Sequence, residues 1–135
     1  MSRSSDNLFD ADTTVLIEHL RGNEKATEFI EKHNPSISVV TTAELMQGAR
    51  DAREQSKVIR ICNSLNQLFI DKKTSSTALE LLSKFHLSNG LNFWDAIIAA
   101  SAIDNKLVLI SDNIKHFRFI AGLQVLAQKE AFAKL

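Results

Sequence analysis

Short aliphatic runs and longer amphipathic stretches alternate along the chain. The run Leu107–Ile110 is aliphatic without interruption, which is typical of a strand covered on both faces. The predicted strands are Leu8–Ala11, Ile37–Val40, Leu68–Ile70, Leu107–Ile110 and Gln124–Leu126. Because strands that alternate with helices usually build parallel sheets, the pattern predicts a three-layer α/β/α domain with a central, mostly parallel sheet of about four to five strands.

Helical periodicity fills the segments between those runs. The helix 93–103 is apolar nearly all round, so we expect it to be buried beside the sheet. A further helix is expected to begin at a Thr41 or Thr42 cap and to end at Gly48. The other predicted helices cover residues 14–20, 24–33, 51–65, 74–87 and 113–120.

Composition and charge narrow the class of protein. The chain has 135 residues, 44% of them hydrophobic, which predicts one domain, residues 1–135, with a flexible segment 1–7 and a C-terminal tail 128–135. Lys plus Arg and Asp plus Glu both number 16, so nucleic-acid binding would need a local basic patch. The single Cys62 excludes an intramolecular disulfide. No secretory signal or membrane-length apolar run is present, which predicts a cytoplasmic protein that spans no membrane.

Four acidic residues stand where apolar runs give way to helices: Asp12, Glu44, Asp95 and Asp112. Ligands of a parallel α/β sheet bind at the carboxyl ends of its strands, so we expect these acids to converge there. Clustered carboxylates repel each other unless they share protons or a cation. The pattern therefore indicates a site for hard metal ions and favours a metal-dependent phosphodiesterase.

Each acid also has a purely local explanation. Thr41 and Glu44 have the spacing of a capping box, and Asp12 and Asp112 could be N-caps. Asp95 lies in a first helical turn, where the helix dipole stabilises a carboxylate by roughly 0.3–1 kcal/mol. The four acids together still favour a shared site. Asp95 carries the most weight, because it heads a helix with almost no polar face and has no Lys or Arg close in sequence.

Four ordered motifs, which extend from Leu8 to about Val125, resemble those of PIN-domain nucleases. The resemblance is strongest to the VapC-type toxins of bacterial and archaeal toxin–antitoxin pairs. The matching segments are Asp12–Ile17 with Leu20–Gly22, Thr42–Ala49, Asp95–Ala102 and Leu109–Phe117.

The resemblance implies an endoribonuclease that hydrolyses RNA phosphodiester bonds with Mg²⁺ or Mn²⁺. It implies that Asp12, Glu44 and Asp95 bind the metal and that a fourth residue completes the site, at the position of Asp112, Asn113 or His116. We predict Asp112 as the fourth residue, with Asn113 as its helper. The further supporting residues are Thr13 and Ser111, and Thr14 stands where the family commonly has Asn. The resemblance also implies an antitoxin partner and a homodimer.

Basic residues recur at three- and four-residue steps after the second motif: Arg50, Arg53, Lys57 and Arg60. Such a stripe is most often a solvated helix face, partly balanced here by nearby acids. Its functional interpretation is a surface that contacts RNA or an acidic antitoxin segment, to which Lys115 could add.

Two other classes of protein stay open at this point. Asp10 and Asp12 form an Asp-x-Asp pair that resembles the opening motif of haloacid-dehalogenase-type phosphatases, with Asp10 as the nucleophile and Asp12 as the acid. That interpretation leaves Glu44 and Asp95 without roles. A non-catalytic PIN-like interaction module is the third possibility, and the retention of all the acids argues against it.

Overall fold

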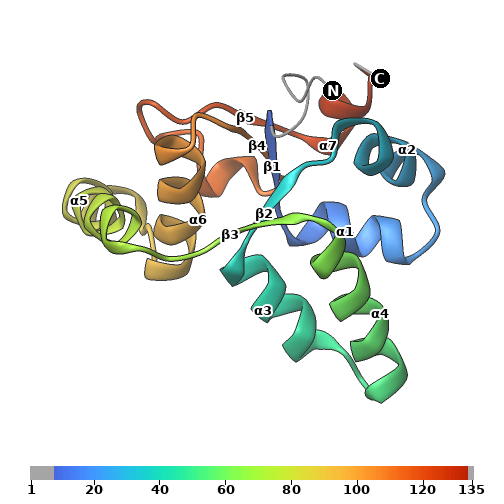
Figure 1. Cartoon of the computed structure of the whole chain (residues 1–135). Helices are drawn as coiled ribbons and strands as arrows, with labels where there is room; N and C mark the ends of the chain where they lie inside the picture. The colour runs from blue at the N-terminus through green and yellow to red at the C-terminus, as the bar shows by residue number, and fades with distance from the viewer. Residues whose placement is uncertain (1–7, 134–135) are drawn as a thin grey trace.

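The computed structural model of the chain describes residues 8–133, so the predicted flexible segment 1–7 lies outside the described residues (Figure 1). The strands are β1 (Phe9–Ala11), β2 (Ser36–Ser38), β3 (Asn66–Leu68), β4 (Val108–Ile110) and β5 (Val125–Leu126). The α-helices are α1 (Thr13–Leu20), α2 (Glu24–His33), α3 (Val39–Gly48), α4 (Ala52–Ser64), α5 (Lys72–Asn89), α6 (Phe93–Asp104) and α7 (Gln128–Phe132), and η1 (Ile114–His116) is one turn of 3-10 helix.

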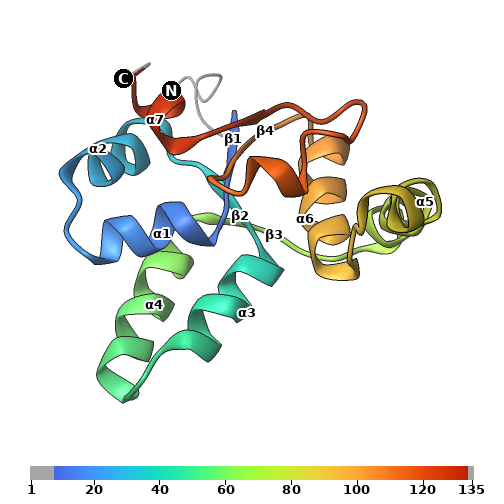
Figure 2. The same ribbon diagram turned by 180° about the vertical axis from the view of Figure 1, so that it is seen from behind.

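All five strands are parallel and lie in the order β3-β2-β1-β4-β5. At the centre of the sheet, Asp10 of β1 is in register with Ser36 of β2 on one side and Leu109 of β4 on the other. Helices α5 and α6 lie to one side of the strands, and α1, α2 and α4 lie to the other (Figures 1 and 2). The predicted three-layer parallel fold is confirmed.

Two hydrophobic clusters hold the helices to the sheet. The first joins α5 and α6 to the sheet residue Leu109 and to Phe117, and the apolar helix α6 is buried as predicted. The second joins α1, α2 and α4 to Ala11 and Ile110, and it includes the buried Cys62. Among residues 8–133, no helix is long and apolar enough to cross a membrane.

The junction between β2 and α3 differs from the prediction. The strand ends at Ser38, and α3 begins at Val39, because the Ser38 hydroxyl caps the helix by accepting a hydrogen bond from the Val40 N–H at 3.1 Å. The β-branched run that follows was predicted to extend the strand, but the cap starts the helix earlier. The prediction of a cap at Thr41 or Thr42 is therefore wrong. The capping-box explanation of Glu44 is wrong with it, because Glu44 lies well inside α3.

Other element boundaries also shift. Strand β3 lies at residues 66–68 rather than 68–70, and Phe69 is 68% exposed. Helix α5 begins two residues early because Asp71 accepts a hydrogen bond from the Thr74 N–H at 2.8 Å and caps it. The predicted helix 113–120 is reduced to the single turn η1.

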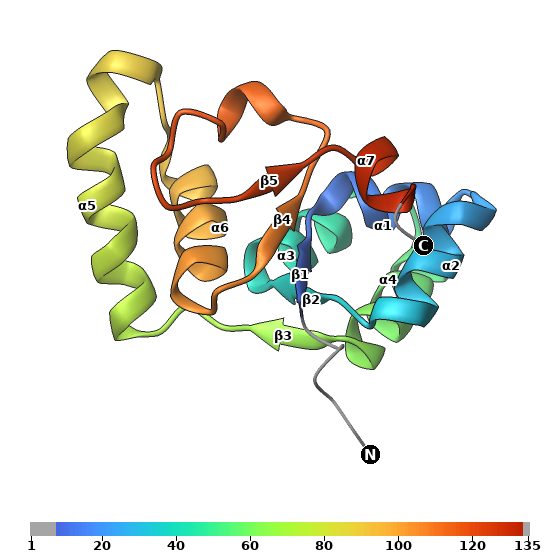
Figure 3. The same ribbon diagram turned by 90° about the horizontal axis from the view of Figure 1, so that it is seen from above.

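The C-terminal tail predicted from residue 128 is a structured element up to residue 133. Helix α7 packs against α2, as Figure 3 shows. The rings of Phe132 and Phe29 lie with their centroids 5.5 Å apart, and Ala131 is fully buried. Helix α7 thus adds Ala131 and Phe132 to the second hydrophobic cluster.

Candidate active site

The carboxyl ends of β1 and β4 bring two of the predicted acids together. Asp12 directly follows β1 and is the N-cap of α1, and Asp112 follows β4 on the neighbouring strand. Burial raises the pKa of Asp12, and the nearby charge of Asp112 raises it further. The chain thus holds these two carboxylates close enough to repel each other at one edge of the sheet.

The other two acids come from helices α3 and α6. Glu44 is exposed in α3, and Asp95 lies half-buried in the first turn of α6. Burial raises the pKa of Asp95, and the charge of Glu44 raises it further, while a contact with His116 lowers it. Asp95 and Glu44 therefore form a second interacting pair of carboxylates.

Thr13 connects the two pairs. It follows Asp12 directly, and its hydroxyl donates a 2.7 Å hydrogen bond to Oε1 of Glu44, 31 residues further along the chain. The predicted supporting residue thus lies between the strand end and α3. The Thr13–Glu44 hydrogen bond therefore places the pair of Glu44 and Asp95 next to the pair of Asp12 and Asp112.

The carboxylate of Asp12 is held firmly from one side. Its Oδ1 atom accepts hydrogen bonds from the backbone N–H of Thr14 at 2.9 Å and from the Thr14 hydroxyl at 2.6 Å. A hydrogen bond from Ser111, the other predicted supporting residue, also lowers the pKa of Asp12. Thr14 stands where the family commonly has Asn, and from that position its hydroxyl donates a hydrogen bond to Asp12.

Asp112 has partners that the sequence did not indicate. Its Oδ1 accepts from the Gln128 backbone N–H at 2.9 Å, and its Oδ2 accepts from Gln128 Nε2 at 2.8 Å. Gln128 begins α7, whose own N-cap residue is Ala127 and has no side-chain oxygen, so Asp112 does the capping from 16 residues away. The neighbouring Asn113 is exposed, and its side chain caps nothing in η1.

We expect Asp112→Asn to lower the free energy of unfolding by about 1 kcal/mol, because an amide can accept only one of the two Gln128 hydrogen bonds. Gln128→Ala should cost a similar amount. The double variant should cost little more than either single variant, because both remove the same contact. Urea denaturation measures all three, with the exposed Lys129→Ala on the same helix as the control. Fully additive losses would show that the pair contributes nothing.

Asp10 is separate from the site surface. It is fully buried, and among the described residues neither of its carboxyl oxygens has a hydrogen-bond partner. Burial raises the pKa of Asp10 well above its usual value, and the charge of Asp12 adds to the effect. A nucleophile must reach its substrate, so this burial removes the basis of the phosphatase alternative, which needs Asp10 to attack a phosphate.

The basic residues of the predicted stripe do not form one free surface. Arg50 precedes α4 instead of lying on it, and its guanidinium forms an ion pair with Glu54 at 2.6 Å. Arg53, Lys57 and Arg60 are exposed on α4. The stripe prediction is therefore wrong for Arg50 and stays a prediction for the other three.

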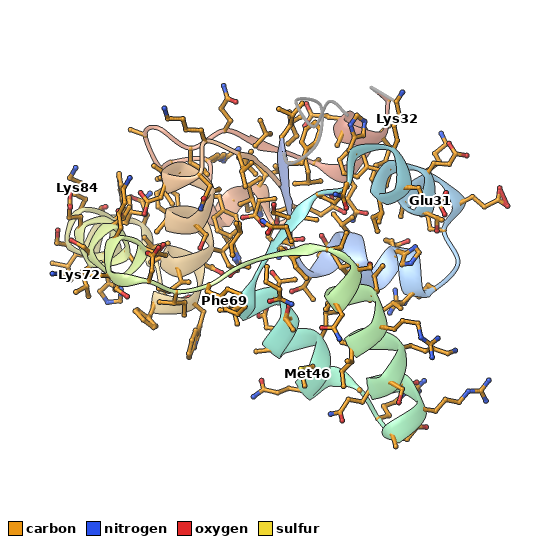
Figure 4. The ribbon with its side chains drawn as sticks, in the orientation of Figure 1. Glu31, Lys32, Met46, Phe69, Lys72 and Lys84 are labelled. Atoms are coloured by element: carbon orange, nitrogen blue, oxygen red, sulfur yellow. The ribbon has the colours of Figure 1, made fainter. Side chains whose placement is uncertain are left out.

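A cavity of about 550 Å³ lies between α1, α3 and α4, next to Glu44. Its apolar lining includes Ile17, Leu45 and Val58, and its charged lining includes Arg21 and Lys57. By contrast, Figure 4 shows Lys72 and Lys84 on α5, at the opposite end of the molecule. Arg21 and Lys57 line this cavity together with Glu44, and Lys115 is exposed next to His116 in sequence.

The acids fit a divalent cation by their chemistry. Carboxylate oxygens are the ligands that Mg²⁺ and Mn²⁺ prefer. The charge of Asp112 contributes to raising the pKa of Asp12, and the charge of Glu44 contributes to raising the pKa of Asp95. Among residues 8–133, no three His, Cys, Asp or Glu side chains are grouped as closely as a finished metal site requires. The carboxylates form two pairs, Asp12 with Asp112 and Asp95 with Glu44.

The fold and this arrangement of acids define a class. The chain belongs to the PIN-domain family, whose model matches residues 11–122. Among known proteins, ribonuclease VapC10 of Mycobacterium tuberculosis is 35% identical over 118 residues, which cover 84% of this chain and 88% of that protein. The suspected family is therefore confirmed.

Solved structures agree on the fold. A toxin–antitoxin complex from Klebsiella pneumoniae contains a chain that is 27% identical, with a TM-score of 0.73 over 88% of this chain and 96% of that one. DNA-bound VapBC from Salmonella typhimurium contains a chain with a TM-score of 0.76 and 21% identity, over 90% of this chain and 98% of that one. The second likeness shows the fold alone.

Proposed function

We propose that this protein is a divalent-metal-dependent endoribonuclease, the toxin of a toxin–antitoxin pair. The observation that carries the proposal is the pair Asp12 and Asp112 at the strand ends of a PIN fold, with a second pair, Glu44 and Asp95, next to it across the Thr13–Glu44 hydrogen bond. Burial of Asp12 and Asp95 and the repulsion within each pair destabilise the charged carboxylates, and a bound cation would offset this. The similarity to ribonuclease VapC10 supports RNA as the substrate.

On this proposal Asp12 and Asp95 hold the main ion, Mg²⁺ or Mn²⁺, and Glu44 and Asp112 hold a second ion or position water. A bound ion would activate water and offset charge on the phosphate. The protein's own side chains hold these carboxylates in position. Thr14 fixes one oxygen of Asp12, and Thr13 holds Glu44 next to α1.

Exposed aromatic rings border the acids and support a single-stranded substrate. Phe93 and Trp94 immediately precede Asp95, are 42% and 59% exposed, and lie with their ring centroids 5.3 Å apart. Unpaired bases stack on such rings, and each stacked base contributes about 1–3 kcal/mol. Arg53, Lys57, Arg60 and Lys115 are candidates for contacts with the RNA backbone.

We propose that the antitoxin binds in the cavity next to Glu44. Its apolar lining and its cations Arg21 and Lys57 suit a segment with apolar and acidic side chains. The solved toxin–antitoxin complex with a similar chain supports such a partner. We also propose that the protein acts in the cytoplasm and forms a homodimer.

The direct test is incubation of the purified protein with RNA in Mg²⁺, in Mn²⁺ and in EDTA. We expect internal cleavage with either metal and none in EDTA, because the carboxylates need the cation to act on a phosphodiester. Parallel turnover of p-nitrophenyl phosphate should be absent. An intact RNA under all three conditions would favour a non-catalytic module, and cleavage in EDTA would exclude the carboxylate–metal mechanism.

A further inference from the structure

We propose that His116 is a positioning residue of the active site, which holds Asp95 in the orientation that the reaction needs. This inference rests on the proposed nuclease function. Nδ1 of His116 lies 3.2 Å from Oδ2 of Asp95, within hydrogen-bond distance. A carboxylate only accepts, so Nδ1 is the donor and the tautomer of the ring is fixed by this contact.

The backbone around His116 is anchored, so the contact is not that of a loosely held surface ring. His116 ends η1, and its N–H donates a 2.9 Å hydrogen bond to the Asn113 carbonyl. The next residue, Phe117, is only 2% exposed and belongs to the α5–α6 cluster. A buried neighbour therefore fixes the start of the side chain, while the ring reaches out to Asp95.

The hydrogen bonds of Asp95 all fall on one oxygen. Nδ1 of His116 lies 3.2 Å from Oδ2, and Nδ2 of Asn92 donates a longer hydrogen bond to the same oxygen at 3.4 Å. Among the described residues, Oδ1 has no hydrogen-bond partner. Oδ1 is therefore the oxygen of Asp95 that stays available for the cation of the proposed function.

Asp112, our sequence-based choice for the fourth residue, is placed differently. Both of its oxygens accept hydrogen bonds from Gln128, and these contacts cap α7. Two side chains of this segment contact a central acid directly: Ser111 contacts Asp12, and His116 contacts Asp95. The segment after β4 therefore serves both central acids, and His116 is the residue that orients Asp95.

Two amide substitutions separate the possible roles of the ring. Asn places its amide nitrogen near the position of Nδ1, whereas Gln places it near Nε2. If His116 works by donating Nδ1–H to Asp95, we expect His116→Ala and His116→Gln to lower the single-turnover rate constant about 10- to 100-fold. His116→Asn should retain most of the wild-type rate.

The affinity for Mn²⁺, measured by electron paramagnetic resonance without RNA, should follow the same order, because a misoriented Asp95 is a poorer ligand. His19→Ala is the matched control, since Nδ1 of His19 contacts the Thr27 hydroxyl of α2 from the last turn of α1, at the other end of that helix from Asp12. It should change neither the rate nor the affinity. Thermal unfolding of every variant shows whether the fold is intact.

Wild-type rate and Mn²⁺ affinity in His116→Ala would overturn the inference. Equal losses in the Asn and Gln variants would overturn it as well, because they would show that the Nδ1 donor is not what matters. Failure of the proposed function would be recognised separately, by cleavage that survives in Asp12→Asn.

Discussion

Replacement of Asp12 with Asn is expected to lower metal-dependent RNA cleavage by about 100-fold or more, to the background of the assay. Asp12 is 5% exposed and directly follows the central strand β1. Burial and the charge of the neighbouring Asp112 both raise the pKa of this carboxyl. An amide keeps the shape but loses the charge that a divalent cation needs.

The same substitution should leave the fold intact. The amide oxygen of Asn can still accept the hydrogen bonds from Thr14, so the N-cap of α1 is preserved. Removal of a buried charge should keep the stability equal or raise it. Asp104→Asn, at the far end of α6, is the matched control and should retain activity. Undiminished cleavage by Asp12→Asn would refute the site assignment.

Replacement of Asp10 with Asn should change the pH dependence of stability rather than catalysis. The pKa of Asp10 is raised well above the usual value because the carboxyl is buried, so the folded state binds this proton more tightly than the unfolded state. Stability from this group is therefore present at low pH, and it is lost as the pH rises through the folded pKa. Asn does not titrate, so the variant should lose less stability than the wild-type protein on the alkaline side.

Urea denaturation from pH 4 to pH 9 measures this difference. We expect the two curves of unfolding free energy against pH to diverge above pH 4, with the variant less sensitive to pH. RNA cleavage by Asp10→Asn should stay within about tenfold of the wild-type rate, because Asp10 faces no substrate. Parallel curves would contradict the burial of an unpaired carboxyl, and abolished cleavage would give Asp10 a direct role.

The bounds of a helix could be predicted from the sequence where single residues cap its start and its end. Helix α2 has the predicted bounds Glu24–His33, because Asn23 caps its start and Asn34 takes the left-handed conformation at its end. At the junction of β2 and α3, two local conformational preferences conflict. The β-branched residues after Ser38 favour a strand, whereas the Ser38 hydroxyl caps a helix, and packing of Val40 and Thr41 into the interior decides for the helix.

The acids of the candidate site and its supports Thr13 and Ser111 could be predicted from the sequence, but the partners of Asp112 and Asp95 could not. Asp12, Glu44 and Asp95 stand in recognisable motifs at strand and helix ends. The contacts between Asp112 and Gln128 and between His116 and Asp95 join segments that are distant in sequence. Such pairs depend on how α7 and η1 dock on the sheet, and no periodicity or spacing in the sequence records that docking.

The most direct test of the carboxylate–metal site is single-turnover cleavage of one labelled RNA while Mg²⁺ is raised from zero, with wild-type protein and Asp12→Asn measured side by side. The wild-type rate constant should rise from background and saturate as the cation fills the site. The variant should stay at background throughout. Equal cleavage by both proteins, or a wild-type rate that does not depend on Mg²⁺, would contradict a metal-dependent nuclease built on these acids.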